Sequence, residues 1–418
     1  MKVFIKTYGC SFNQSDSEIM TGALGKKGHE IVSSIKDADL VLINSCTVKN
    51  SAESKFWKDV RSIQKPKVLA GCVPEADTDK SRYKDYSVIS TKCLGMAAEV
   101  AEKTLAGEVV HATSKTALTR TNMPRQRKNP MVDIVPINEG CLGSCSFCKT
   151  KFARGHLHSY PLKDIVQHVR DALNSRAEEI WLTSQDTACY GYDIGTNLIE
   201  LLKEILKLKR DFKIRLGMGN PDFLPDYAGQ LAELFRDPRM FKFLHIPLQS
   251  GSDNVLKAMK RNYNASRFEE LVSLFRKYIP EMTFATDIII GFPGETEEDF
   301  AKTLEVLEKT KPDVINLSKY WARPGTVSAK LKLLPTETVK ARSLEIKSLF
   351  ADISKENNRK WLGWTGEVLI DEVGTKNTFV GRNLSYKPIV MKGDFTLGQK
   401  LKVKIVDTTV FDLRAVPL

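Results

Sequence analysis

The sequence lacks any long hydrophobic run. None of its apolar stretches reaches the roughly 20 residues needed to cross a bilayer, so no membrane-spanning helix is expected. Its first residues, Met1–Tyr8, are too few and too charged for a secretory signal peptide. Eight cysteines without such a signal favour a cytoplasmic, reducing compartment, where cysteines bind metals or react instead of forming disulfides.

Acidic residues are outnumbered by basic ones. The chain has 51 Asp and Glu against 63 Lys and Arg, a formal net charge of +12. Such an excess favours a polyanionic partner, with nucleic acid the first expectation. With 418 residues, of which 42% are apolar and 27% charged, the chain is expected to form two to three globular domains.

Three cysteines are crowded into one short loop. Cys141, Cys145 and Cys148 follow the spacing C-x3-C-x2-C within a Gly- and Ser-rich run. A fully ligated iron–sulfur cluster takes four thiolates, so three thiolates leave one iron open to a small molecule. The spacing resembles that of the radical S-adenosylmethionine (SAM) enzymes, in which SAM fills this position. A zinc site completed by His156 or His158 is the alternative, although zinc motifs normally use cysteine pairs and close to four ligands.

Residues 1–113 are predicted to form an open α/β domain. Short runs rich in Val, Ile and Leu at 2–8, 40–44 and 67–70 are typical of buried parallel strands, and helical stretches follow them. One cysteine comes just after each run, namely Cys10, Cys46 and Cys72. Because the carboxyl ends of parallel strands meet at one crevice, these cysteines are expected to form a second open cluster site. Ordinary burial of three small residues is the alternative.

A basic linker is predicted at 114–129, followed by a domain at 130–357 in which strands and helices alternate. Six predicted strands begin near residues 131, 179, 213, 242, 283 and 314, with amphipathic helical stretches between them. This order predicts a partial (β/α)6 barrel with its chemistry at the carboxyl ends of the strands. The cysteine loop at 141–148 follows the first of these strands, where such a barrel would place it.

Polar or Gly-rich turns follow the later strands of this domain. None of these turns contains G-x-x-x-x-G-K-[ST] or G-x-G-x-x-G, so a phosphate-binding loop is not favoured. Together the turns can supply amides and hydroxyls for the ribose, adenine and methionyl groups of SAM, and an aromatic side chain between the cluster ligands can pack near its adenine. The predicted cofactor-binding residues are Phe147, Ser184, Gln185, Gln249 and Gly291.

Residues 358–418 contain five short strand-like runs, which predict a small antiparallel β-barrel. Three lysines alternate along one run and would project from one face of a strand, where they could hold a phosphate backbone. A fully solvated linker and tail are the alternative. The predicted RNA contacts are Lys400, Lys402, Lys404, Arg125, Arg127, Lys128, Lys151 and Arg154.

The motifs, in this order, resemble one family across nearly the whole chain, the methylthiotransferases. That family combines a three-cysteine N-terminal domain, a radical-SAM barrel and a C-terminal TRAM barrel. The run from Cys141 to Gly155 is similar to the archaeal and eukaryotic branch, which acts on N6-threonylcarbamoyladenosine at position 37 of tRNA. The matching sequences are Thr7-Tyr-Gly-Cys10-x-x-Asn13-Gln-x-Asp-Ser17, Asn44-Ser-Cys46-Thr-Val48, Ala70-Gly-Cys72, Gly140-Cys141-x3-Cys145-x2-Cys148, Leu248-Gln-Ser-Gly-Ser-Asp253, Gly291-Phe-Pro-Gly-Glu-Thr296 and Arg323-Pro-Gly-Thr326.

The resemblance implies a reaction that uses two [4Fe-4S] clusters and SAM. SAM cleaved at the Cys141/Cys145/Cys148 cluster would give a radical that abstracts the C2 hydrogen of the modified adenine. The Cys10/Cys46/Cys72 cluster would present sulfur, and a second SAM would give the methyl group. The protein would hold these groups and exclude water.

The resemblance also implies partners. They are tRNA and an electron donor such as a flavodoxin or ferredoxin, and the protein itself is expected to be a monomer. A methylthiotransferase acting on an aspartate of a ribosomal protein is one alternative, and a non-catalytic iron–sulfur RNA-binding protein is another. Cys93, Cys189 and His245 are expected to be structural.

Overall fold

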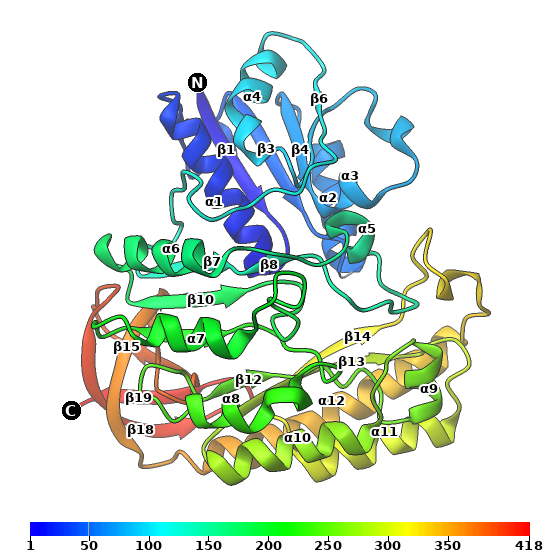
Figure 1. Ribbon diagram of the computed structural model, residues 1–418, viewed down its shortest axis with the longest axis vertical. Coiled ribbons are helices and arrows are strands. Elements are labelled where there is room, and N and C mark those ends of the chain that lie inside the picture. The colour runs from blue at the N-terminus through cyan, green and yellow to red at the C-terminus, as the bar shows by residue number, and fades with distance from the viewer. Residues whose placement is uncertain (49) are drawn as a thin grey trace.

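The computed structural model describes residues 1–48 and 50–418. Three bodies follow one another along the chain: an N-terminal α/β domain, a central partial barrel and a small closed β-barrel at the C-terminus (Figure 1). No helix among the described residues is long and apolar enough to cross a bilayer. The predicted three-part α/β architecture is confirmed.

The N-terminal domain is built on a parallel six-stranded sheet in the order β2-β1-β3-β4-β5-β6. Leu40 and Leu42 of β3 pack with α1 (Ser11–Lys26) and α4 (Ala97–Leu105), whereas Val41 and Ile43 pack with α2 (Asn50–Ser62). Every residue of β3 is buried because alternate side chains point to opposite faces and helices cover both. The strands are β1 (Lys2–Thr7), β2 (Glu30–Ile31), β3 (Leu40–Ser45), β4 (Lys67–Gly71), β5 (Ser87–Ile89) and β6 (His111–Ala112).

The central domain contains six parallel strands in two three-stranded sheets, β11-β10-β7 and β12-β13-β14. The amide of Ile214 donates to the carbonyl of Arg239 at 2.7 Å and the amide of Phe241 donates to the carbonyl of Ile214 at 3.0 Å, which joins the two sheets. The strands are β7 (Val132–Pro136), β10 (Glu179–Thr183), β11 (Lys213–Leu216), β12 (Phe243–His245), β13 (Thr283–Ile290) and β14 (Val314–Lys319). Six βα units therefore form the expected partial barrel.

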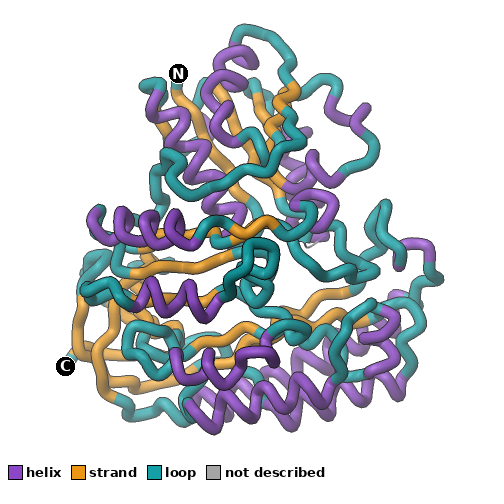
Figure 2. The backbone as a smooth tube through the Cα atoms, viewed as in Figure 1, coloured by secondary structure: helices purple, strands orange, loops and turns teal. Residues whose placement is uncertain are grey.

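Helices cover the outer side of this barrel (Figure 2). They are α6 (Leu162–Asn174), α7 (Leu198–Leu206), α8 (Ala228–Leu234), α9 (Asp253–Ala258), α10 (Ala265–Tyr278), α11 (Glu297–Thr310) and α12 (Thr336–Arg359). Helix α11 begins at a capping box, in which the side chains of Thr296 and Asp299 each accept from the other residue's backbone amide. Short 3₁₀ turns occur at Ile35–Asp37, Lys80–Tyr83, Leu94–Met96, Leu224–Tyr227 and Ser328–Lys330.

The C-terminal domain is a closed five-stranded barrel in the order β15-β16-β17-β19-β18. Four of its strand pairs are antiparallel, whereas β17 and β19 run parallel, so the expectation of a wholly antiparallel barrel misses one pair. The cause is the connectivity, because β19 inserts between β17 and β18 and closes the barrel. The strands are β15 (Thr365–Val373), β16 (Thr378–Arg382), β17 (Pro388–Lys392), β18 (Lys400–Thr408) and β19 (Leu413–Pro417).

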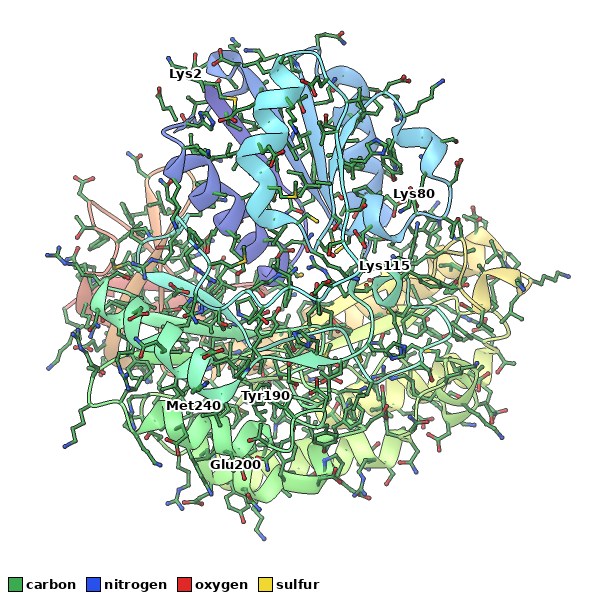
Figure 3. The ribbon with its side chains drawn as sticks, turned by 45° about the horizontal axis from the view of Figure 1, so that its top comes forward. Lys2, Lys80, Lys115, Tyr190, Glu200 and Met240 are labelled. Atoms are coloured by element: carbon green, nitrogen blue, oxygen red, sulfur yellow. The ribbon has the colours of Figure 1, made fainter. Side chains whose placement is uncertain are left out.

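The linker runs along the seam between the N-terminal domain and the barrel, where Figure 3 labels Lys115. Arg120 of this linker is fully buried. Its Nε donates to Asp16 of α1 at 2.6 Å, and its Nη1 donates to Glu139 of β8 (Asn138–Glu139) at 2.8 Å. Burial of a guanidinium is tolerated here because carboxylates from both domains pair with it. A fully solvated linker is therefore wrong.

Candidate catalytic centre between two cysteine groups

The N-terminal cysteine group, defined as Cys10, Cys46 and Cys72, lies at the carboxyl edge of the N-terminal sheet. Cys10 caps α1 after β1, Cys46 follows β3, and Cys72 opens α3 (Cys72–Ala76) after β4. Cys10 is exposed, whereas Cys46 and Cys72 are buried. Burial raises the pKa of Cys46 to about 12, and nearby Cys72 and Cys10 raise it as well. The three thiols thus share one site, and iron that binds there has to displace their protons.

Two neighbouring residues shape this group. Gly9 has a φ of +111°, and a Cβ there would lie 2.8 Å from the Cys46 sulfur, so glycine is required. The Asn13 side chain donates to backbone carbonyls at the ends of β1 and β3, at 3.0 and 2.7 Å. The Cys72 thiol donates to Asn13 Oδ1 at 3.5 Å. Asn13 therefore ties all three cysteine loops together, and only its place three residues after Cys10 in the family motif pointed to it.

The barrel cysteine group, defined as Cys141, Cys145 and Cys148, lies in the loop between β8 and α5 (Thr150–Arg154). The amide of Gly143 donates to the Cys141 sulfur at 3.2 Å, and Arg261 Nη1 donates to the Cys145 sulfur at 3.0 Å. A Cβ on Gly143 would lie 3.3 and 3.8 Å from these two sulfurs, so both sulfurs face the same side of the loop. Hydrogen bonds to sulfur are one of the means by which proteins tune iron–sulfur clusters, and this donor set fits such a cluster.

One zinc ion and a four-iron cluster require different arrangements of their ligands. Within residues 1–48 and 50–418, no three His, Cys, Asp or Glu side chains converge on a point where a single ion would be held. A four-iron cluster spreads its cysteine ligands over different irons, so its sulfurs need not converge in this way. The alternative ligand His158 packs edge-on against Tyr160 with ring centroids 5.7 Å apart.

Two side chains beside the barrel cysteine group were not anticipated. Asp186 is 1% exposed, and its Oδ1 accepts from the amides of Ala188 and Asn220 at 3.0 Å each. Burial raises the pKa of Asp186 to about 6, and its Oδ2 lies 3.9 Å from the Cys141 sulfur. Cys189, expected to be structural, is buried, and its hydrogen bond to Cys141 lowers the pKa of Cys141. The polar turn after β10 was the sequence signal for both.

Three of the predicted SAM-binding residues lie beside this group, and a fourth, Gln249, lies in the turn after β12. Gln185 Oε1 accepts from the amide of Gly140, next to the first cysteine, at 2.7 Å, and Ser184 Oγ accepts from the amide of Asp186 at 3.0 Å. Phe147 packs in one apolar cluster with residues of α9 and β13. Gln249 has a φ of +70°, and its Oε1 is buried with no hydrogen-bond donor in the described part of the chain. An orphaned acceptor of this kind suits a bound polar ligand.

Gly291 has a different environment. Its amide donates to Glu295 Oε2 at 2.8 Å, and a Cβ on it would lie 2.5 Å from Val339 of α12. Its backbone donor is already used and its open side is filled by a helix. These contacts favour a packing role for Gly291 over the predicted SAM contact.

Arg154 was predicted to contact RNA, and this prediction is wrong. The residue is 3% exposed and lies between the two domains. Its Nη2 donates to Asp16 at 2.7 Å and to Asn13 at 2.8 Å, and its Nη1 donates to Glu139 at 3.1 Å. The guanidinium also interacts with the Cys72 thiol. The guanidinium of Arg154 forms charge-assisted hydrogen bonds with two buried carboxylates, Asp16 of the N-terminal domain and Glu139 of the barrel. Arg154 therefore connects the region of the N-terminal cysteine group to the barrel.

Other predicted RNA contacts also have partners within the protein. The side chains of Arg125 and Arg127 are 10% and 13% exposed and lie 3.8 and 3.5 Å from Asp133. Lys151 Nζ donates to the carbonyl of Gly143 at 2.7 Å, which supports the barrel cysteine loop. These contacts favour structural roles for the three residues.

The C-terminal lysines divide into two kinds. Lys400 Nζ lies 3.3 Å from Glu178 and 3.0 Å from Asp211, both at the edge of the central domain, so this lysine docks the C-terminal barrel. Lys402 and Lys404 are exposed on β18, as is Lys128 in the linker. These three are the predicted RNA contacts that remain available to a phosphate backbone.

Arg323, in the loop after β14, lies between the two cysteine groups. Its charge interacts with Cys148 on one side and with Cys46 on the other. Its Nη2 donates to the carbonyl of Val48, which belongs to the N-terminal domain. Burial lowers the pKa of the guanidinium. The Arg-Pro-Gly-Thr motif predicted a turn at the barrel mouth, but it did not predict which groups Arg323 contacts.

Comparison with known protein families gives a consistent pattern. A family described as the radical SAM superfamily matches residues 135–307, and one described as uncharacterized protein family UPF0004 matches residues 2–90. The TRAM domain matches residues 359–418.

Full-length relatives share 37–40% identity with this chain. A protein of Pyrococcus horikoshii named "Probable threonylcarbamoyladenosine tRNA methylthiotransferase" is 38% identical, covering 94% of this chain and 95% of the relative. One with the same name from Methanothermobacter thermautotrophicus is 40% identical over 98% of both chains. The human "Threonylcarbamoyladenosine tRNA methylthiotransferase" is 37% identical, covering 100% of this chain and 74% of the human protein.

Among solved structures, the radical SAM methyltransferase TsrM from Kitasatospora setae is similar in fold. It superposes with a TM-score of 0.55 at 15% identity, covering 78% of this chain and 75% of TsrM.

Proposed function

The chain belongs to the threonylcarbamoyladenosine tRNA methylthiotransferase family, and we propose that it converts N6-threonylcarbamoyladenosine at position 37 of tRNA to its 2-methylthio derivative. The observation that carries this function is the meeting of two cysteine groups at one domain interface. Cys72 of one group packs against Ala153 of α5, the helix that directly follows the other group. A substrate at this interface is therefore within reach of both groups.

Two [4Fe-4S] clusters and SAM, when bound, supply the one-electron chemistry, the sulfur and the methyl group. The residues of the chain hold these groups. The two cysteine groups are the proposed cluster ligands, while Gly143 and Arg261 donate hydrogen bonds to sulfurs of the barrel group. Ser184, Gln185, Gln249 and Phe147 are the proposed SAM contacts around the barrel mouth.

Buried ion pairs cross the domain interface beside the two cysteine groups. Arg154 is buried against Asp16 of one domain and Glu139 of the other, and Lys149 is buried against Asp77 at 2.6 Å. Such ion pairs keep the two domains at a fixed separation. A fixed separation would hold a substrate between the two groups in one position.

tRNA is the partner that this function requires, and the TRAM domain match accords with RNA binding. The names of the relatives refer to a tRNA nucleoside, which favours tRNA over the ribosomal-protein substrate. Lys128, Lys402 and Lys404 are the proposed phosphate contacts. We further infer a reducing cytoplasmic location, a monomer, and reduction by a flavodoxin or ferredoxin.

Mass spectrometry of nucleosides tests the proposal. Anaerobically reconstituted protein is incubated with SAM, a reductant, a sulfide source and tRNA that carries N6-threonylcarbamoyladenosine at position 37. We expect the 2-methylthio nucleoside to form with the wild type and to disappear when the N-terminal cysteine group is replaced by alanine.

Cys93→Ala is the matched control, because Cys93 is a buried cysteine of the same domain that packs in the core beside α4. This variant should retain the product. Absence of the 2-methylthio nucleoside with the reconstituted wild type, or normal formation by the triple variant, would contradict the proposal.

A further inference from the structure

A cavity of about 270 Å³ opens between the N-terminal domain and the loop that follows β14. Trp57 of α2 and Trp321 of that loop line it, together with the charged side chains of Glu53, Asp77, Arg82 and Lys149. Lys149 directly follows a cysteine of the barrel group, and Glu53 accepts from Thr47, which directly follows a cysteine of the N-terminal group, at 3.2 Å. The cavity therefore adjoins both cysteine groups, on the side of the molecule where α2 and the yellow loop after β14 approach each other (Figure 1).

Two buried hydrogen-bond donors, one on a residue that lines the cavity and one on a residue next to the lining in sequence, have no acceptor within the described part of the chain. The indole Nε1 of Trp57 is buried and unpaired within the described residues, and so is Nη1 of Arg323, which lies between Trp321 and Pro324 in the sequence. Arg323 also forms no ion pair with a carboxylate in the part of the chain that the structure describes, although its charge interacts with that of Glu53. Buried donors are nearly always paired in native proteins. Their presence here indicates a ligand rich in acceptors.

The charges around the cavity leave one positive charge over. Asp77 is fully used, because it accepts from Lys149 at 2.6 Å, from Arg82 at 3.3 Å and from the hydroxyl of Tyr83 at 2.5 Å. Among the side chains that line the cavity, the cations Arg82 and Lys149 balance the carboxylates of Asp77 and Glu53. Arg323, beside the lining, adds a third cation whose charge interacts with that of Glu53. A ligand with one negative charge would complete the balance.

The walls suit a planar ligand as well as an anion. The Arg82 guanidinium lies 4.1 Å from the centroid of the Trp57 ring, and that of Arg323 lies 5.2 Å from the Trp321 ring. The side chain of Arg82 is still 45% exposed, so a ligand can reach it. Stacking on aromatic rings and on guanidinium planes is a common way to hold an unstacked base. The volume lies just below the usual range for small-molecule pockets, about 300–1,000 Å³, which suits a group of the size of a base substituent.

We propose that this cavity binds the anionic threonylcarbamoyl substituent of the substrate adenosine, with Arg323 and Arg82 as the carboxylate-binding side chains and Trp57 as a donor to the carbamoyl oxygen. The inference rests on the proposed function. The substituent fits because it carries one carboxylate and several acceptor oxygens on a planar base. The adenine has to enter the space between the cysteine groups for its C2 to react, and its N6 substituent then falls in the adjoining space.

The test compares the affinity of the reconstituted full chain for three anticodon stem-loops. They differ only at position 37, which is adenosine, N6-threonylcarbamoyladenosine, or the methyl ester of the latter. A charge-assisted hydrogen bond of this kind corresponds to roughly ten- to hundredfold in Kd. The wild type is expected to bind the threonylcarbamoyl stem-loop tighter than the other two by that factor.

Arg82→Gln and Arg323→Gln should each lose most of this preference while their Kd for the adenosine stem-loop stays within about threefold of the wild-type value. The two variants lie in different domains, so a folding defect in one leaves the other informative. Arg236→Gln is the matched control, because Arg236 is an exposed arginine just after α8 that forms a surface pair with Glu233 at 3.2 Å. It should keep the wild-type preference.

Four results overturn the assignment. Retention of the preference by both variants would show that the carboxylate binds elsewhere. An equal loss of affinity for all three stem-loops would identify these arginines as phosphate contacts. A wild type that forms the 2-methylthio nucleoside without any binding preference would also exclude the cavity while the proposed function stands. A wild type that neither prefers nor modifies the threonylcarbamoyl stem-loop would remove the function and the cavity assignment together.

Discussion

Replacing Arg120 by methionine should loosen the seam between the N-terminal domain and the barrel. Arg120 and Arg154 are both buried, and they share the carboxylates of Asp16 and Glu139. The four charges balance. Arg120→Met keeps much of the aliphatic volume but leaves two buried carboxylates with one guanidinium.

The expected magnitude follows from that imbalance. Removal of one partner from a buried ion pair costs about 3–5 kcal/mol. The loss falls on the contact between the domains, because Asp16 belongs to α1 and Glu139 belongs to β8. At about 1.4 kcal/mol for each factor of ten, opening of the seam should become at least about 100-fold more frequent.

Hydrogen exchange on the iron-free, reduced full chain measures this opening. Amides of α1 and β7 should exchange faster in Arg120→Met, whereas amides of the C-terminal barrel should keep their rates and serve as an internal reference. Arg236→Gln is the surface control. Its ion pair with Glu233 joins side chains that are 63% and 60% exposed, and loss of such a pair costs below about 1 kcal/mol.

A second variant separates charge from packing. Arg120→Met combined with Glu139→Gln restores neutrality around Arg154, so seam exchange should return more than halfway to the wild-type rate. Seam exchange within threefold of wild type in Arg120→Met would refute the reasoning. If the double variant exchanged as fast as the single variant, the loss would come from packing and not from charge.

Three further outcomes are expected. Replacement of the barrel cysteine group by alanine should halve the iron bound and abolish formation of 5′-deoxyadenosine from SAM. Replacement of the N-terminal cysteine group should also halve the iron bound but leave formation of 5′-deoxyadenosine intact. SAM cleavage by the variant without the barrel group would contradict the assignment of the two groups. Lys402→Glu with Lys404→Glu should weaken tRNA binding and flatten its dependence on log salt by roughly 0.7 per lost phosphate contact, while SAM cleavage without RNA persists. An unchanged slope would show that these two lysines do not contact the RNA. Burial raises the pKa of Glu18 from 4.5 to about 7, so between these values the folded chain binds a proton that the unfolded chain has lost. The free energy of unfolding should therefore fall by up to about 3 kcal/mol as pH rises from about 5 to 7. Thermal melts should show no such fall for Glu18→Gln, and parallel pH profiles of the variant and the wild type would contradict this expectation.

The strands and the cysteine groups were predictable from sequence because their signals are local. A run such as Leu40–Asn44 is apolar at nearly every position, which indicates a strand covered on both faces, and β3 is buried throughout. Parallel strands end at one edge, so three cysteines after three such runs had to be neighbours in space. The burial of Cys46 and Cys72 beside Cys10 follows from the same geometry.

The contacts around the cysteine sulfurs were not predictable in the same way. Arg261 reaches Cys145 from a loop more than 100 residues further along the chain, and Asn13 reaches Cys72 across the sheet edge. No short window of sequence contains both partners. Such pairs become visible only when the fold has set which strand ends are adjacent.

The same reasoning explains why charge was a poor guide to RNA contacts. A net charge of +12 is the excess of basic over acidic residues, but it does not identify the basic residues that lack an acidic partner. The sequence gives no reason to distinguish Arg154 and Lys400 from Lys402, because all three are basic residues. In the structure, Arg154 is buried 2.7 Å from Asp16, and Lys400 lies 3.0 Å from Asp211. Their partners lie 138 and 189 residues away in the chain, on other domains. A basic residue at a domain seam therefore pairs with acidic residues of the neighbouring domain. The cations that stay free for RNA lie beyond the seam, as Lys402 and Lys404 do on the exposed part of β18.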